Sequence, residues 1–254
     1  MTFLNFALKM KKHKEKIIIV TGGSGLIGKS IVNQILNDGN IPLNLDVFDS
    51  KSPCTFINCN ITDNNEVEKA FEHIYENFGK IDGLVNNAYP RKKEFAVDFQ
   101  EVQEKQLVEQ LHFQLASYFL CCQQAIKYMK RNNGGSIVNI SSIYGSFGND
   151  FSLYQNTNMN PPGVYNMVKG GVNSLTNYLA AKFGKDKIRV NTVSPGGIFD
   201  GQHKEFVERY STKVPLSRMG NPEDISPLVS FLLSDKANYL TGQNIMVDGG
   251  LTCI

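Results

Sequence analysis

The sequence predicts an α/β fold, in which a single doubly wound domain places helices on both faces of a parallel sheet. Two observations lead to this prediction. Short runs rich in β-branched residues alternate with longer amphipathic stretches, and several runs are apolar throughout, which indicates strands buried on both faces. The predicted strands are residues 16–23, 41–48, 54–59, 81–88, 135–142, 188–195 and 243–250.

Apolar residues with helical spacing predict the elements between these strands. The expected helices are residues 26–38, 64–78, 100–131, 163–183 and 222–234. N-cap candidates precede two of them, in "TDNN" at 62–65 and "NPED" at 221–224.

The domain is expected to cover residues 16–254, because no linker or repeat interrupts the alternation. Residues 1–15 are expected to form a flexible tail, or to lie partly outside the protein if translation starts at Met10. A signal peptide is not expected, because the basic residues follow the apolar part and no small-residue cleavage site appears.

The composition excludes several classes of partner. Lys plus Arg (26) nearly balance Asp plus Glu (24), so no basic surface for nucleic acid is expected. The five cysteines form no CxxC pair, so we expect reduced thiols and no metal site. The apolar runs are too short to span a membrane, and we expect a cytoplasmic protein without membrane contact.

The first strand leads into a glycine-rich turn, "TGGSGLIG" at residues 21–28. Glycines at 22, 23, 25 and 28 permit positive φ and leave the N-terminus of the next helix open to a diphosphate. A purely structural turn is the alternative. The position between a buried strand and an amphipathic helix favours a dinucleotide site.

Asp46 ends the second strand, where a dinucleotide fold places the acid that binds the adenosine ribose. A carboxylate there also repels a 2′-phosphate, and no Arg or Lys occurs at residues 23–25 or 47–48. These residues favour NAD over NADP as the cofactor. Asp49 is the alternative residue for binding the ribose. If this is not a dinucleotide site, either Asp would serve only as a turn cap.

Taken in order, these and further motifs resemble the short-chain dehydrogenase/reductase family from Lys16 to Gly250. The further motifs are "NIT" (60–62), "LVNNA" (84–88), "GSIVNISS" (135–142), "YNMVK" (165–169), "RVNTVSPGGI" (189–198) and "TGQNIMVDGG" (241–250). The resemblance implies a seven-stranded Rossmann sheet and hydride transfer between a nicotinamide cofactor and a carbonyl or alcohol. The implied cofactor-binding residues are Gly22, Ser24, Gly25, Leu26, Ile27, Gly28, Asp46, Asn60, Ile61, Asn87, Ala88, Tyr165, Lys169, Pro195, Gly196 and Ile198.

Ser142, Tyr165 and Lys169 are the predicted catalytic residues. Tyr165 and Lys169 are four apart on a predicted helix and so project from one face. A nearby ammonium lowers the pKa of a phenol, so Tyr165 would exchange the proton and Lys169 would also bind the nicotinamide ribose. Ser142 would hold the substrate oxygen, whereas Ser141 should face the opposite side of the strand.

Four features depart from the family pattern. The glycines are spaced G-x-x-G-x-x-G, with Leu26 at the usual middle glycine. Tyr89 replaces the glycine of "NNAG", which puts an aromatic ring beside the cleft. Gln114 stands where members usually have the asparagine that anchors a proton-relay water, and we include it as a fourth catalytic candidate.

The fourth departure is an insertion of about ten residues between Ser142 and Tyr165. It is rich in amide and aromatic side chains, which suit a polyhydroxylated ligand. The predicted substrate-binding residues are Ser142, Tyr89, Tyr154 and Asn156. The alternative is a loop that packs on a neighbouring subunit or covers the helix.

The insertion resembles a branch of the family found among flagellin-modification and surface-polysaccharide oxidoreductases. The predicted function is therefore NAD(P)-dependent oxidation or reduction of a sugar-derived metabolite. A catalytically weak dinucleotide-binding sensor or scaffold is the alternative. The resemblance also implies a homo-oligomer, tetramer or dimer, and a lid at residues 199–214. On this lid Lys204, Arg209 and Lys213 are candidates to neutralise a substrate anion, and the alternative is a charged, solvated helix.

Overall fold

The computed structural model describes residues 15–90, 97–157 and 159–254, and the predicted tail therefore lies, except for Glu15, outside the described residues. Seven parallel strands form one sheet in the order β3-β2-β1-β4-β5-β6-β7. The strands are β1 (Ile17–Thr21), β2 (Ile41–Asp46), β3 (Thr55–Asn58), β4 (Gly83–Asn86), β5 (Gly135–Ile140), β6 (Ile188–Pro195) and β7 (Asn244–Val247). This confirms the predicted doubly wound Rossmann architecture, and each strand lies within a predicted run.

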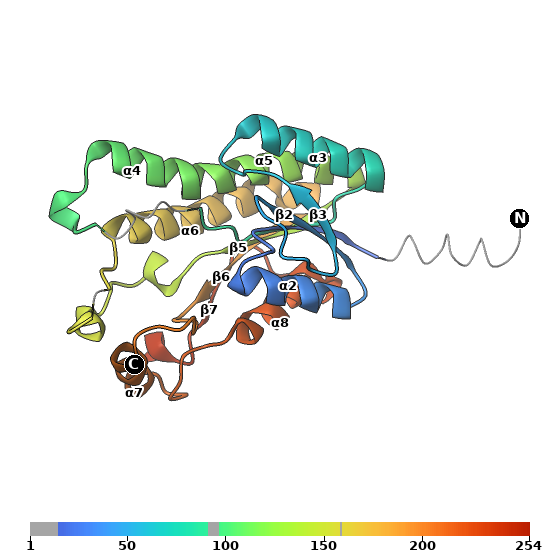
Figure 1. Ribbon diagram of the computed structural model, residues 1–254. Helices are drawn as coiled ribbons and strands as arrows, with labels where there is room; N and C mark the ends of the chain where they lie inside the picture. The colour runs from blue at the N-terminus through green and yellow to red at the C-terminus, as the bar shows by residue number, and fades with distance from the viewer. Residues whose placement is uncertain (1–14, 91–96, 158) are drawn as a thin grey trace, which may run out of the picture.

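Helices cover both faces of the sheet (Figure 1). On one face α2 (Leu26–Asn37) packs beside α8 (Pro222–Leu233), and the other face carries α3 (Asn64–Phe78), α5 (Ser117–Met129) and α6 (Gly163–Phe183). Both N-cap predictions are confirmed, since the Asp63 carboxylate accepts from the first turn of α3 and Asn221 forms a capping box with Asp224. No helix in the described part of the chain is both long and apolar enough to span a membrane.

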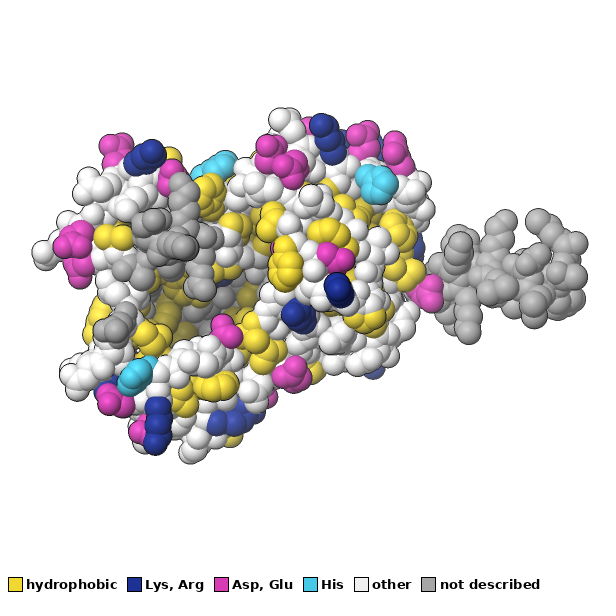
Figure 2. Space-filling model, viewed as in Figure 1, with side chains coloured by type: hydrophobic (Ala, Val, Ile, Leu, Met, Phe, Trp, Pro, Cys, Tyr) yellow, Lys and Arg dark blue, Asp and Glu magenta, His cyan; other side chains and the backbone are white. Residues whose placement is uncertain are grey.

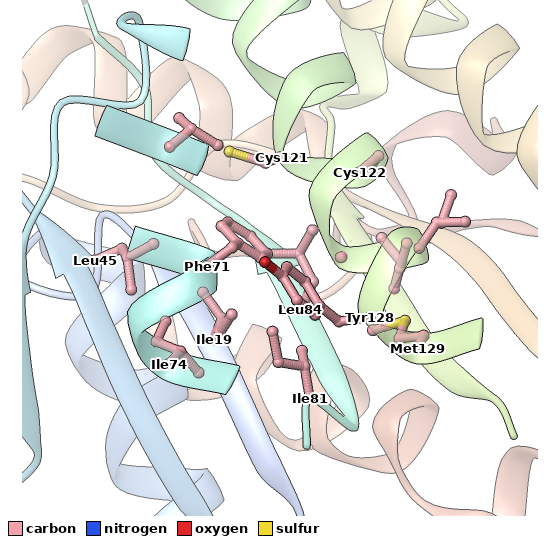
Figure 3. Close-up of a cluster of buried hydrophobic side chains, with 14 of the residues drawn as sticks. Ile19, Leu45, Phe71, Ile74, Ile81, Leu84, Cys121, Cys122, Tyr128 and Met129 are labelled. Carbon is pink, nitrogen blue, oxygen red and sulfur yellow. The ribbon is translucent and has the colours of Figure 1, made fainter. Parts of the chain in front are cut away.

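The interior consists of two apolar layers, one on each side of the sheet. In the layer under α3 and α5, Phe71 and Ile74 project toward Ile19 and Leu84 of the strands, and Met129 closes the end of the cluster (Figure 3). All of these side chains are fully buried. Burial on both faces explains why the strands lack polar alternation.

The predicted helix at residues 100–131 is wrong as a single element. A short turn at Phe99–Glu101 precedes α4 (Glu104–Gln110), which continues through a π-helical turn (Leu111–Ala116) into α5. A π turn widens the helix and alters which side chains face the sheet. It contains Gln114, so the irregularity occurs beside a predicted site residue.

The insertion after β5 and the segment after β6 pack together at one end of the sheet. The insertion includes the turn Phe151–Tyr154, and the other segment includes α7 (Lys204–Lys213). They share a small hydrophobic cluster, separate from both sheet layers, that we call the cap cluster. Its buried members are Leu153, Phe206, Tyr210, Val214 and Met219.

Candidate active site

The glycine-rich turn lies at the carboxyl end of β1, beside the point where the strand order reverses between β1 and β4. Gly22 has φ of +66°, and a Cβ there would lie 2.7 Å from the Ala88 Cα. A Cβ on Gly28 would overlap the Gly22 carbonyl oxygen. These two glycines therefore allow α2 to begin directly behind the turn, with Gly25 as its N-cap.

A cavity of about 730 Å³ opens at the N-terminus of α2. Most of the predicted cofactor-binding residues of the turn and adenosine side line it, namely Gly22, Gly25, Leu26, Ile27, Asp46, Asn60, Ile61, Asn87 and Ala88. Ser24 and Gly28 are not among the lining residues. Both are buried behind the turn, where Gly28 packs α2 against the backbone of Gly22 and Gly23.

Ser24 holds the end of β2 against the turn instead of facing the cavity. Its hydroxyl donates to the Phe48 carbonyl (2.7 Å) and accepts from Asn44 Nδ2 (2.9 Å), while its backbone N–H donates to Asp46 Oδ2 (3.1 Å). Asp46 thus presents its carboxylate from a fixed position on the cavity wall. The alternative residue, Asp49, accepts from the Lys51 N–H and is not part of the wall.

A second cavity, of about 440 Å³, adjoins the first and shares Leu26, Ile27, Asn87, Tyr89 and Asp200 with it. Ser142, Tyr165 and Lys169 line this second cavity, as do Pro195, Gly196 and Ile198. Figure 2 shows this side of the molecule hollowed between the regions that carry α4 and α7, with hydrophobic side chains within the hollow.

Lys169 is buried within a group of three tyrosine rings. Its Nζ donates to the Ile140 carbonyl (2.9 Å) and lies 5.2 Å, 5.6 Å and 5.7 Å from the ring centroids of Tyr89, Tyr165 and Tyr118. Burial lowers the pKa of Lys169 to about 7. The aromatic faces and the carbonyl attract the ammonium, and they offset only part of the cost of burying its charge.

Tyr89 contacts both the lysine and the tyrosine of the site. Its ring packs edge-on against that of Tyr165, with centroids 5.5 Å apart and an interplanar angle of 86°. Because Tyr89 lines both cavities, the substitution in "NNAY" places an aromatic ring at their junction.

The two serines at the end of β5 face different neighbours. Ser141 is buried and donates to the Lys169 carbonyl (3.0 Å), which ties β5 to α6. Ser142 Oγ accepts from the Tyr144 N–H (3.2 Å), and its own hydroxyl hydrogen can still be donated into the cavity. The structure therefore leaves Ser142 as the serine available to a ligand.

Gln114 is buried next to this site on the π-helical turn. Its Nε2 donates to the Pro90 carbonyl (3.1 Å) and to Gln110 Oε1 (2.9 Å). Its Oε1 is buried and has no hydrogen-bond partner among the described residues. Only the amide oxygen is thus free to bind a water or a ligand.

The insertion forms part of the second cavity. Tyr154 lines it together with Met159, Asn160, Pro161 and Pro162, whereas Asn156 lies outside the lining, exposed and with φ of 56°. The sequence alone did not identify Tyr118, Tyr144 or Asp200, which also contact Lys169 or line the cavity. The spacing of Tyr118, four residues after Gln114, was the available signal for one of them.

Two of the three cations on the predicted lid bind the insertion, whereas Lys204 pairs with Glu208 on its own helix (3.6 Å). Arg209 donates to the carbonyls of Leu153 (3.2 Å) and Gln155, and Lys213 pairs with Asp150 and donates to Ser152 Oγ (2.8 Å). The expectation that these two side chains neutralise a substrate anion is not supported by this geometry. Their positive charge is used to hold the two segments of the cap together.

The residues present fit a bound dinucleotide. The glycine-lined helix N-terminus suits a diphosphate, the Asp46 carboxylate suits a ribose diol, and the adjoining cavity brings Tyr165 and Lys169 to the other end of the cleft. Among the described residues, no cluster of three His, Cys, Asp or Glu side chains could hold a metal ion. The fold and the site together define a nucleotide-binding α/β protein.

The chain belongs to the short-chain dehydrogenase/reductase family, an oxidoreductase family whose members use NAD(P). The sequence pattern described as enoyl-(acyl carrier protein) reductase, which represents this family, matches residues 34–252. This confirms the resemblance inferred from the motifs.

Two curated relatives have similar overall identity to the chain but different names. Post-translational flagellin modification protein A of Campylobacter coli is 34% identical over 251 residues, which is 93% of this chain and 98% of the relative. A 3-oxoacyl-(acyl-carrier-protein) reductase of Staphylococcus aureus is 34% identical over 255 residues, with the same coverage.

Solved structures of the family share the fold. A short-chain dehydrogenase from Leptospira borgpetersenii with bound NAD+ superposes with a TM-score of 0.85 at 35% identity, covering 94% of this chain and 93% of that one. An aldohexose dehydrogenase from Thermoplasma acidophilum gives a TM-score of 0.83 at 26% identity, covering 94% and 95%.

Proposed function

We propose that this protein is an NAD-dependent oxidoreductase that transfers a hydride between nicotinamide and a hydroxyl or carbonyl carbon of a small, sugar-derived metabolite in surface-glycan or flagellin-glycan biosynthesis. The observation that carries the proposal is that Ser142, Tyr165 and Lys169 line one cavity that opens into the glycine-lined cleft. When bound, the cofactor supplies or accepts the hydride.

Tyr165 is the proton-transfer residue in this proposal. In carbonyl reduction its phenol gives a proton to the substrate oxygen, and in alcohol oxidation the phenolate takes that proton. The Lys169 ammonium, 5.6 Å from the Tyr165 ring centroid, favours the phenolate and also binds the nicotinamide ribose. Ser142 donates to the substrate oxygen and offsets the charge that develops there.

The remaining assignments follow the same geometry. Gln114 Oε1, which lacks a protein partner among the described residues, accepts from a relay water that returns a proton through Lys169. Asp46 accepts from the adenosine ribose and disfavours a 2′-phosphate, which supports NAD rather than NADP. Tyr89 and Tyr154, which both line the second cavity, contact the substrate.

Two findings support a sugar-derived substrate. One structural neighbour is named an aldohexose dehydrogenase and one relative a flagellin modification protein. The insertion also contributes phenol and amide groups to the cavity. The reductases that act on acyl-carrier-protein thioesters favour a second candidate, reduction of a 3-oxoacyl group. A substrate panel separates the two.

The test measures the absorbance of reduced nicotinamide with NAD or NADP and a panel of aldohexoses, N-acetylated amino sugars, sugar phosphates and 3-oxoacyl thioesters. We expect turnover of a sugar and a loss of at least about a hundredfold in kcat for Tyr165→Phe. Tyr239→Phe, at a fully exposed position, is the matched control. Cofactor binding without turnover of any compound would instead support the sensor or scaffold alternative.

We infer that the protein acts in the cytoplasm as a homotetramer or dimer. Free thiols at Cys59 and Cys121 suit a reducing compartment. Exposed apolar side chains on α5 and α6, including Phe119, Met167 and Tyr178, provide a surface for a second copy. Light scattering coupled to size exclusion tests the assembly, and Met167→Glu should shift it toward the monomer.

A further inference from the structure

Two phenol groups meet on the wall of the catalytic cavity. Tyr144 belongs to the short turn Ile143–Gly145 that directly follows Ser142, and Tyr154 comes from the insertion. Their hydroxyl oxygens are 3.1 Å apart, and both residues line the cavity that contains Ser142, Tyr165 and Lys169. A site that needed only an apolar wall would not require two hydroxyls at this point.

The hydrogen-bond count of the pair leaves one donor for a ligand. Each phenol has one hydrogen, and the bond between the two oxygens uses one of the two. In the part of the chain that the structure describes, neither hydroxyl has another hydrogen-bond partner. Burial, and then the adjacent Tyr154, raise the pKa of Tyr144, so this phenol stays protonated at neutral pH. The pair can therefore donate once and also accept.

Both phenols are held in place from behind. Arg209 binds the carbonyls of Leu153 and Gln155, which flank Tyr154 on either side. The ring of Tyr154 also packs against Phe206 of the cap cluster, with centroids 5.4 Å apart. Asn173 of α6 donates to the carbonyl of Gly145 (3.1 Å), which fixes the turn that carries Tyr144. Groups held in this way bind a ligand at a lower entropic cost.

We propose that Tyr144, acting with Tyr154, binds a second hydroxyl group of the substrate, other than the oxygen at the reacting carbon. This inference rests on the proposed function and deepens it, because it makes a polyhydroxylated substrate the class that the site selects. Tyr144 N–H binds Ser142 Oγ, so the phenol pair and the serine that holds the reacting oxygen belong to one continuous piece of wall.

A purely structural role for the pair is the competing explanation. In that case the phenols join the insertion to the turn after β5, and their loss weakens the cap equally for every substrate. The two explanations differ in one respect. Only a direct contact makes the effect of a substitution depend on whether the substrate carries the second hydroxyl.

The experiment compares Tyr144→Phe, Tyr154→Phe and the double variant with the wild-type protein. The probes are the sugar that the wild-type protein turns over fastest in the panel above and the monodeoxy analogues of that sugar. We expect each single variant to lose about fivefold to tenfold in kcat/KM for the parent sugar. The losses should not add in the double variant, because the phenols act as a pair.

For one monodeoxy analogue, the wild-type protein and the variants should have equal kcat/KM, and that analogue identifies the hydroxyl that the pair binds. Urea unfolding of each variant shows whether the fold is intact, and Tyr239→Phe serves as the control for removal of a phenol oxygen. Equal losses on every analogue, or no loss on the parent sugar, would overturn the assignment. If the wild-type protein turns over no sugar at all, the proposed function itself fails, and this inference fails with it.

Discussion

Replacement of Lys169 by Met should make the protein more stable at neutral and acidic pH while removing its activity. The side chain is buried, and its pKa in the folded chain is about 7 against an ordinary value of 10.5. At about 1.4 kcal/mol per pKa unit, this difference in pKa corresponds to a free-energy cost of about 5 kcal/mol for keeping Lys169 protonated in the folded state. Methionine fills a similar volume without a charge, but it loses the hydrogen bond to the Ile140 carbonyl, which offsets about 1–2 kcal/mol.

The direction of the pH dependence follows from proton uptake. Between about pH 7 and pH 10.5 the unfolded chain carries the proton on Lys169 and the folded chain does not, so unfolding takes up a proton. The wild-type protein therefore gains stability from this group as the pH rises through that window. The Lys169→Met variant lacks this gain. The free energy of unfolding of the variant should exceed that of the wild-type protein by about 3 kcal/mol near pH 6. This difference should vanish or change sign near pH 10.

Urea unfolding of both proteins, without cofactor, at a series of pH values from about 6 to 10 measures the difference directly. Lys182→Met is the matched control, because Lys182 lies exposed on the same helix. A difference in stability between wild type and Lys169→Met that stays constant across this range would refute the reasoning. It would mean that Lys169 keeps an ordinary pKa despite its burial.

Three further outcomes follow from the geometry. Gly28→Ala should cost about 2 kcal/mol or more in urea unfolding and should abolish NAD binding by fluorescence titration, because the added methyl group overlaps the Gly22 carbonyl. An intact NAD affinity would show that the turn can shift. Asp46→Asn should weaken NAD binding by about tenfold, because the carboxylate accepts from the ribose. It should also bring the dissociation constants of NAD and NADP closer together, because the carboxylate repels a 2′-phosphate. An unchanged ratio of the two dissociation constants would assign the preference to other groups. Arg209→Ala should raise KM more than it lowers kcat, because the loss of the guanidinium frees the backbone on both sides of Tyr154. Lys204→Ala, on the same helix, is the control. Equal KM values for these two variants would argue against that role.

The strands could be predicted from the sequence because burial on both faces leaves a direct signature. A run such as that around Ile19 has no polar alternation, and only a sheet covered on both sides explains it. The glycine turn and the pair Tyr165–Lys169 were also accessible, since their geometry is set within one turn or one helix. Gly22 and Gly25 line the first cavity, and Tyr165 and Lys169 line the second.

The parts that the sequence did not predict depend on contacts between distant segments. The tyrosine rings around Lys169 come from residue 89 in the loop after β4, residue 118 on α5 and residue 165 on α6. The partners of Arg209 are backbone carbonyls of the insertion, and backbone groups leave no trace in side-chain composition. The π-helical turn was missed because its residues keep ordinary helical apolar content while the hydrogen-bond spacing changes.

The cap cluster has a consequence for how such proteins diversify. Since Leu153, Phe206 and Tyr210 make their own small interior, the two segments they join can vary in length and chemistry without altering the layers on either side of the sheet. Exchanging both segments together between relatives should therefore transfer substrate preference. Exchanging only one segment would leave the apolar side chains of the other without their packing partners in the cap cluster. Substrate specificity should therefore change through both segments together, although about fifty residues separate them in the sequence.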